Sequence, residues 1–153
     1  MLTRDAVREK VQHLLVEGME LQPVLLKGGM MRVEFGEEAP SVLISFEDMG
    51  AGGDRQRTVV ETSSVILRAV DPSPELFMWA ATEGAQYLIG HTRVILGEDP
   101  DGKAMLVYES RVLGDFLDEE ELEVSFNATW IIASELSEAL QPRFGGKRWN
   151  EEE

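Results

Sequence analysis

The segment from about Thr58 to Val70 constrains the fold more than any other part of the chain, because it has the composition of a central strand. It is rich in Val, Ile and Thr, which pack well on the pleated surface of a sheet. In its second half Val65, Ile66 and Leu67 follow one another. Both faces are therefore apolar there, as in a strand that is buried on both sides. The sequence predicts a sheet with this segment in its interior.

Two shorter strands are predicted before this segment. Apolar residues alternate with polar or charged ones over residues 31–35 and 42–47, which is the two-residue period of a strand. Residues 37–40 form a turn between them, and a loop over residues 48–56, with Gly50, Gly52 and Gly53, leads to the third strand. Three consecutive strands with short connections predict an antiparallel meander.

Helical patterns precede and follow the meander. Thr3 or Asp5 can cap a first helix that ends at Gly18, because apolar residues recur at helical spacing between them. Ser73 suits the N-cap of a second helix over about residues 74–88, and proline at its first position needs no backbone N–H. The inward stripe predicted for this second helix is Phe77, Ala81, Gly84 and Leu88.

The rest of the chain predicts two more strands and a last helix. Strands over residues 91–97 and 104–112 are joined by a hairpin loop whose Asp101-Gly102 pair supplies the reversal. A helix then runs to about Leu140, with Pro142 as its stop. The order α-β-β-β-α-β-β-α predicts a single α+β domain over residues 1–146, an antiparallel sheet with helices packed on it, followed by a short polar tail over residues 147–153.

Composition excludes several classes of protein. The chain of 153 residues has 29 acidic and 14 basic side chains, a net charge of −15, and no cysteine. It therefore cannot form a disulfide, a zinc ribbon or a thiol nucleophile, and its acidity disfavours nucleic-acid binding. The charged N-terminus lacks a signal peptide, and the longest apolar stretches are far shorter than the roughly 20 residues that span a membrane. We expect a cytoplasmic protein with no nucleic-acid or membrane partner.

The residues that commonly carry catalysis are few. His13 and His91 have neither the spacing nor the neighbours of metal ligands, and we expect structural roles for both. The glycine loop lacks the G-K-[ST] ending of a phosphate loop, and residues 99–102 lack the remaining ligands of a calcium loop. The acidic run over residues 115–123 matches the positive end of the last helix. Glu61, Glu83 and Glu109 are the only carboxylates placed in or near apolar segments, so we expect no enzymatic activity, cofactor or metal.

Binding surface is the remaining possibility. In the second helix Leu76, Met78 and Trp79 lie off the inward stripe, which is typical of a helix that meets another subunit. Met30 and Met49 fall at strand edges or loop ends, where methionine suits varied apolar partners. We expect these five residues to form a dimer or partner interface; the alternative is that they fill gaps in the core.

The whole arrangement resembles a known superfamily. The stretch Ala85-Gln-Tyr-Leu-Ile-Gly-His-Thr-Arg-Val94, the hairpin over residues 94–112, the acidic run into the helix with Leu122–Leu140, and Phe144-Gly145-Gly146 resemble the YbjN-like and type III secretion chaperone-like superfamily. Within it, the chain is similar to the actinobacterial TY-Chap peptide-binding chaperone-like domains.

The resemblance implies a curved antiparallel sheet with the first and last helices on one face, and it supplies no catalytic residues. It implies a homodimer that binds extended segments of a partner protein. The YbjN branch implies the alternative, a small-molecule-sensing or stress-response regulatory domain.

Overall fold

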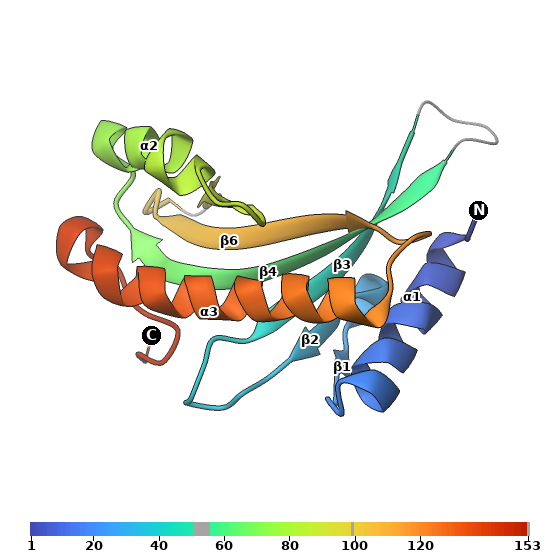
Figure 1. The fold of residues 1–153 in the computed structure, drawn as a ribbon. Helices are drawn as coiled ribbons and strands as arrows, with labels where there is room; N and C mark the ends of the chain where they lie inside the picture. Colours follow the sequence, from blue (N-terminus) through green and yellow to red (C-terminus); the bar gives the residue numbers. More distant parts are fainter. Residues whose placement is uncertain (51–55, 99, 153) are drawn as a thin grey trace.

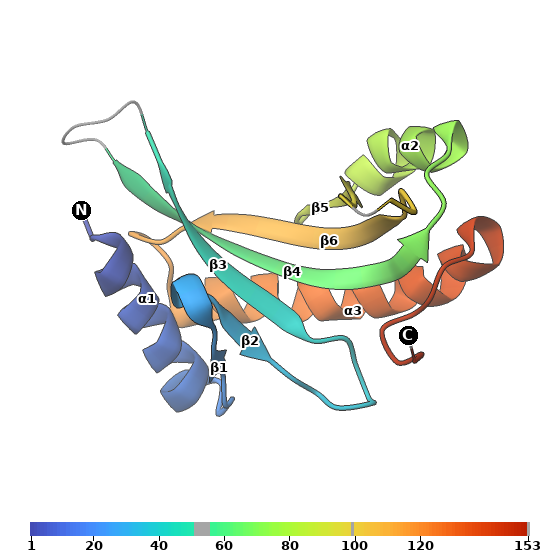
Figure 2. The ribbon, with the colours of Figure 1, turned by 180° about the vertical axis from the view of Figure 1, so that it is seen from behind.

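A six-stranded antiparallel sheet forms the centre of the computed structural model, which describes residues 1–50, 56–98 and 100–152. Its strand order is β1-β2-β3-β4-β6-β5, and Figures 1 and 2 show it from opposite sides. The strands are β1 (Val24–Leu25), β2 (Met31–Val33), β3 (Val42–Met49), β4 (Arg57–Val70), β5 (His91–Leu96) and β6 (Ala104–Leu113). The predicted α+β class and the antiparallel meander of β2, β3 and β4 are confirmed.

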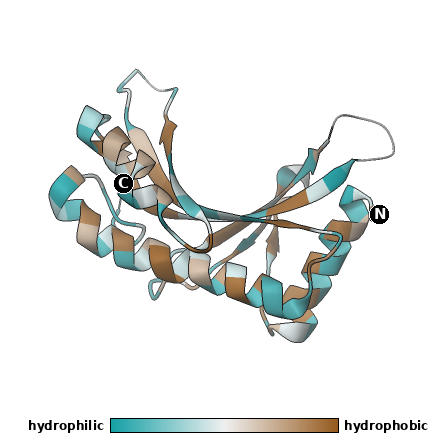
Figure 3. Cartoon of the chain, turned by 45° about the horizontal axis from the view of Figure 1, so that its top comes forward, coloured by the Kyte–Doolittle hydropathy of each residue, from teal (hydrophilic) through white to brown (hydrophobic). Residues whose placement is uncertain are grey.

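The helices pack on one face of this sheet. They are α1 (Arg4–His13), α2 (Pro74–Ala81) and α3 (Glu119–Phe144). A π-helical turn η1 (Leu14–Gly18) continues α1, and a 3-10 turn η4 (Glu83–Ala85) follows α2. A further 3-10 turn η2 (Lys27–Gly29) lies between β1 and β2. The predicted caps are confirmed, because Thr3 accepts a hydrogen bond from the N–H of Ala6 and Ser73 accepts one from Leu76. Figure 3 shows the sheet curving away from α3, which runs along its outer side.

The core between sheet and helices consists of two apolar clusters. The N-terminal cluster joins α1, β2, β3 and the start of α3 through Val7, Val11, Leu15, Met31, Val33, Val42, Ile44, Phe46, Val60, Leu117, Leu122 and Phe126. The C-terminal cluster joins β4, β6, α2 and the end of α3 through Ile66, Leu67, Val70, Leu76, Trp79, Leu106, Tyr108, Ala133 and Leu140. The strands β2, β3, β4 and β6 therefore contribute one of their two faces to the core, as the alternating burial along β3 shows.

Four hydroxyl groups lie between α3 and the sheet, where the core is otherwise apolar. The Oγ1 of Thr62 lies 2.8 Å from the Oγ1 of Thr129 and 3.2 Å from the Oγ of Ser125, which also donates to Ser110 at 2.9 Å. All four side chains are buried. Small side chains let the helix approach the sheet closely, and mutual hydrogen bonds offset the desolvation of the hydroxyls.

The second helix is shorter than predicted, and its inward residues are different. It ends at Ala81 because Thr82 leaves the helical conformation and bonds back to the carbonyl of Met78. Gly84 then packs against Thr92 so closely that an added Cβ would lie 2.0 Å from its Oγ1. The predicted stripe is wrong at both ends, because Phe77 is 41% exposed and Leu88 is fully exposed.

The C-terminal part also differs from the prediction. Pro142 does not stop α3, which makes a further turn to Phe144 and ends at Gly145 with φ +70°. Residues beyond 146 are not simply a polar tail, because Lys147 forms an antiparallel bridge with Arg68 of β4. Residues 51–55, which make up most of the predicted glycine loop, lie outside the described residues. So does Asp99 of the predicted hairpin loop.

Asp115 ties the start of α3 to two distant segments. Its carboxylate accepts hydrogen bonds from the N–H of Leu2 and, at 2.7 Å, from the guanidinium of Arg57. Lys10 of α1 donates to the backbone carbonyl of the same residue. The Leu2 N–H and the Arg57 guanidinium hold the pKa of Asp115 below its ordinary value. Asp115, which belongs to the predicted acidic cluster, thus connects the N-terminus, α1 and β4 with the segment before α3.

The hydroxyl cluster gives a first prediction. Thr62→Val keeps the shape of the side chain but removes its two buried hydrogen bonds, to Thr129 and Ser125, so the free energy of unfolding should fall by about 1–3 kcal/mol. Thr92→Val is the matched control, because the buried Oγ1 of Thr92 has no hydrogen-bond partner among the described residues. Urea unfolding should show no loss of stability for this control. An equal loss of stability in both variants would mean that the hydrogen bonds of Thr62 do not stabilise the fold.

The lowered pKa of Asp115 gives a second prediction. A carboxylate with a depressed pKa in the folded state stabilises the fold above its unfolded pKa of about 3.9, and this contribution disappears as the pH falls through the folded value. Asp115→Asn should therefore be less stable than the wild type at pH 7, and the difference should shrink below about pH 4. Urea unfolding at both pH values measures it, with the exposed Asp101→Asn as control. A difference that is unchanged at low pH would refute the linkage.

Candidate interaction site on the open sheet face

One face of the sheet is not used by the core, and we call it the open face. Strand residues in the two apolar clusters belong to the opposite face. From the strand registers, the open face carries Leu43, Ser45, Glu47, Val59, Glu61, Ser63, Val65, His91, Arg93, Ile95, Met105, Val107, Glu109, Arg111 and Leu113. Figure 2 looks onto this face, with α3 behind the strands. Several of its apolar residues are only partly buried.

Glu109 of β6 is the centre of a charged cluster on this face. Its Oε1 lies 2.9 Å from the Nε2 of His91, its Oε2 lies 2.9 Å from a terminal nitrogen of Arg93, and Arg111 approaches at 3.5 Å. The two arginine contacts are ion pairs, whereas the His91 contact is one only when the imidazole is protonated. Neither oxygen of Glu109 meets hydrogen-bond geometry, so the carboxylate lies beside two guanidinium groups and retains unused hydrogen-bonding capacity.

Glu61 of β4 extends the cluster across the sheet. Its Oε2 accepts a hydrogen bond of 2.7 Å from the Nε of Arg111, and its Oε1 lies 3.8 Å from Arg93. The hydrogen bond from Arg111 to Glu61 is the main cause of a raised pKa at Arg111. The strand register accounts for the contact, because Glu61 and Arg111 are direct partners in the β4–β6 pair. Side chains of β4, β5 and β6 thus form one charged network.

The network is layered, with its carboxylates inside and its basic side chains outside. The side chains of Glu109 and Glu61 are 1% and 9% exposed, whereas those of His91, Arg93 and Arg111 are 43%, 46% and 48% exposed. Arginine can cover apolar and acidic neighbours with its stem while its guanidinium stays in water. A molecule that approaches this part of the open face therefore meets guanidinium groups first.

A glycine and a tyrosine fix the position of β5 beside this cluster. Gly90 has φ +81°, and an added Cβ would lie 2.3 Å from the backbone oxygen of Glu109. Glycine is therefore required where the chain enters β5, and it brings His91 opposite Glu109. On the other face Tyr108 packs edge-on against Tyr87, and burial raises the pKa of Tyr108 to about 12.

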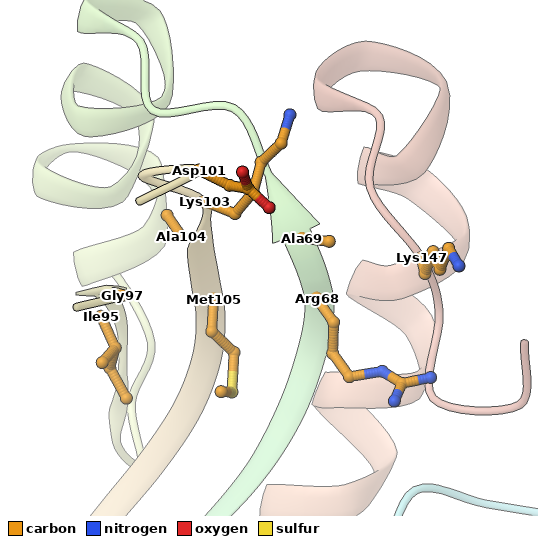
Figure 4. Close-up of a pocket in the computed structure, with 9 residues that line it drawn as sticks. All are labelled: Arg68, Ala69, Ile95, Gly97, Asp101, Lys103, Ala104, Met105 and Lys147. Atoms are coloured by element: carbon orange, nitrogen blue, oxygen red, sulfur yellow. The ribbon is translucent and has the colours of Figure 1, made fainter. Parts of the chain in front are cut away.

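A cavity of about 460 Å³ lies at one end of the open face. Ile95 and Met105 supply apolar side chains, and Arg68, Lys103 and Lys147 supply cations around it. Figure 4 shows these residues on β4, β5, β6, the loop before β6 and the segment after α3, with the side chain of Arg68 extending toward that segment and that of Lys103 pointing away from the strands. The cavity is thus lined by apolar side chains together with three cations and the carboxylate of Asp101.

The residues predicted as an interface do not form one surface. Leu76 and Trp79 lie in the C-terminal apolar cluster, with exposed fractions of 0% and 6%, so on this point the interface assignment is wrong. Met78 is exposed on α2, Met49 is exposed at the end of β3, and Met30 is partly buried before β2. Figures 1 and 2 place α2 and the end of β3 at opposite sides of the molecule.

Of the three carboxylates considered for catalysis, two lie together and one lies elsewhere. Glu61 and Glu109 share the charged cluster, whereas Glu83 is exposed in η4 and pairs with Arg143 at 3.6 Å. His91 begins β5 as expected, and His13 is exposed at the end of α1. Among the described residues, no group of three or more Asp, Glu or His side chains is arranged to hold a metal ion. Arg93 and Arg111 were not predicted as site residues, although each lies in a predicted strand at a position whose side chain points away from the core.

Comparison with known proteins adds no family to this description. The chain matches no model of a known protein family and no curated protein sequence.

None of the described helices is both long enough and apolar enough to span a membrane.

The layered network gives a third prediction. Glu109→Gln removes the buried charge that the half-exposed cations surround, and the free energy of unfolding should fall by about 1–3 kcal/mol, less than for a pair buried on both sides. The exposed Glu47→Gln on the same face is the control and should change stability by no more than about 0.5 kcal/mol. Thermal and urea unfolding measure both. Equal stability of the two variants would show that the network contributes nothing to the fold.

Proposed function

We propose that this protein is a non-enzymatic, cytoplasmic binding domain that docks a segment of a partner protein on the open face of its sheet. The resemblance to the secretion chaperone-like superfamily points in the same direction. So does the net charge of −15, which keeps a binding domain soluble and repels nucleic acid. A protein partner is the class of ligand that fits a broad, curved face.

The observation that carries this proposal is the set of partly buried apolar residues on an otherwise uncovered sheet face. Leu43, Val59, Val65, Ile95 and Met105 are neither packed in the core nor fully exposed. An antiparallel sheet with one solvated face normally presents polar residues on it. Apolar residues in that position favour a face that is covered when the protein works.

The charged cluster supports binding rather than catalysis. Both oxygens of Glu109 and both oxygens of Glu61 lie within ion-pair distance of arginine or histidine. Both carboxylates are also almost inaccessible, with side chains 1% and 9% exposed, whereas a general acid or base must reach the atoms of its substrate. The exposed guanidinium groups of Arg93 and Arg111 remain able to contact carbonyl, carboxylate or aromatic groups of a partner, and arginine is enriched in protein interfaces.

A second candidate is favoured by the cavity at the end of the open face. Its volume of about 460 Å³, its apolar residues Ile95 and Met105, and its excess of three cations over the one carboxylate of Asp101 suit a small organic anion. This matches the alternative of a small-molecule-sensing regulator. Stabilisation of the protein against heat by such an anion, abolished by Met105→Trp, would favour the sensor over the protein-binding domain.

A site-specific crosslinking pair tests the proposed docking face. A photoreactive phenylalanine analogue replaces Leu113 on the open face or Ile131 on α3, two positions that are each 39% exposed. Cells that produce each variant are irradiated, and adducts are resolved by mass. We expect one discrete adduct with a partner protein from position 113 and none from position 131.

Three other outcomes are informative. An adduct of twice the chain mass would identify a second copy as the occupant, as expected for a homodimer. Equal labelling from both positions would mean that the contacts are unspecific. No adduct from position 113 would exclude the open face as the docking surface.

A further inference from the structure

A second large cavity lies on the helix side of the sheet, beside the end of β6. β5 pairs with β6 no further along that strand than Glu109, which lies opposite His91. The residues of β6 after Glu109 therefore have only β4 as a neighbouring strand. Figure 1 shows α3 turning back along β6 after the loop that joins them. A cavity of about 520 Å³ is left between this end of β6, the first turns of α3 and the segment before β5.

The walls of this cavity are apolar although they are open to water. They are formed by Ile89, by Val112 of β6 and by Val124 of α3. Ile89 and Val112 are partly buried, and Val124 is 46% exposed. Cavities that bind small molecules have volumes of roughly 300–1,000 Å³ and mostly apolar linings. The size and the walls of this cavity are therefore those of a small-molecule site.

Every charged side chain that lines the cavity is acidic. These side chains are Asp118, Glu120 and Glu121. Asp118 is already used as the N-cap of α3, because its carboxylate accepts the N–H of Glu121. The carboxylates of Glu120 and Glu121 form no ion pair or hydrogen bond with another described residue. The border of the cavity is thus negative, and no basic residue of the described chain compensates these two charges.

We infer that this cavity binds a small organic amine, with its apolar body against the three apolar walls and its ammonium group beside Glu120 and Glu121. Exposed carboxylates alone hold a cation weakly, so the apolar contact is required for affinity. The carboxylates in turn select a positive charge, and the field of a chain with a net charge of −15 concentrates cations near its surface. None of the lining residues belongs to the open face, so this site goes beyond the proposed function and does not depend on it.

A matched pair of small molecules tests the inference. Phenethylamine, a cation at neutral pH with an apolar ring, is the probe, and the uncharged phenethyl alcohol is its control. Each is titrated into the whole chain at constant ionic strength, and amide NMR spectra locate the change. We expect saturable shifts at Val112 and Val124 with the amine. The alcohol should bind at least about fivefold more weakly, because it lacks the charge that the carboxylates attract.

Two double variants separate the cavity from the general acidity of the helix start. Glu120→Gln/Glu121→Gln removes two carboxylates that line the cavity, whereas the control Glu119→Gln/Glu123→Gln removes two from the same run that do not line it. Both variants change the net charge by the same amount. The dissociation constant of the amine should rise at least about fivefold in the first variant and less than about twofold in the control, because salt screens the more distant charges.

The apolar walls are tested in the same titration. Val124→Trp places a bulky ring at the cavity from an exposed position, and it should abolish the saturable shift at Val112. Ile131→Trp, on the same helix but outside the lining, is the control and should leave binding unchanged. Both positions are exposed, so neither substitution disturbs the core.

Three results would overturn the inference. Without saturable shifts at Val112 and Val124, the cavity would hold no amine of this kind. Equal weakening in both glutamine variants would mean that the acidic surface attracts cations in general and that the cavity selects nothing. Equal affinity for the amine and the alcohol would mean that Glu120 and Glu121 take no part. None of these results bears on docking at the open face.

Discussion

The backbone pairing of β4 is the interaction on which the rest of the structure depends. Over its 14 residues this strand pairs with β3 on one side and β6 on the other, and at Arg68 it pairs with the segment after α3. Its core face supplies residues to both apolar clusters, and Thr62 joins the hydroxyl groups beneath α3. The opposite face positions Glu61 in the charged cluster. A change in the register of β4 by one residue would exchange these two faces.

The charged cluster shows how a sheet face can be polar and still retain buried groups. Carboxylates on β4 and β6 lie beneath arginines that cross between strands. The arginine stems exclude water from the carboxylates, and the carboxylates fix the guanidinium planes. Groups held in this way lose little side-chain entropy on meeting a partner, and this preorganisation is a general source of affinity. The proposed docking face therefore combines partly buried apolar residues with prepositioned donors.

Local signals in the sequence predicted the strands other than β1, the helix starts and, apart from β1, the order of elements. Thr3, Ser73 and Pro74 act through neighbours a few residues away, and alternation along β3 reports burial directly. Contacts between distant segments were not predictable in this way. Leu76 is buried where Phe77 was predicted, because it packs in the C-terminal apolar cluster with residues of β4, β6 and α3 that are distant in the sequence. Glu61 and Glu109 were recognisable as unusual, but their cations follow only from the registers of β4, β5 and β6.

The uneven placement of exposed charge has a consequence for encounters in solution. α3 begins with Glu119, Glu120 and Glu121, whereas the guanidinium groups of Arg93 and Arg111 are exposed on the open face. The field around the molecule, whose net charge is −15, is therefore not the same in all directions. A charged body that approaches through water experiences a torque in this field before any contact forms. Orientation then precedes docking, and salt that screens the field slows association without altering the contacts themselves.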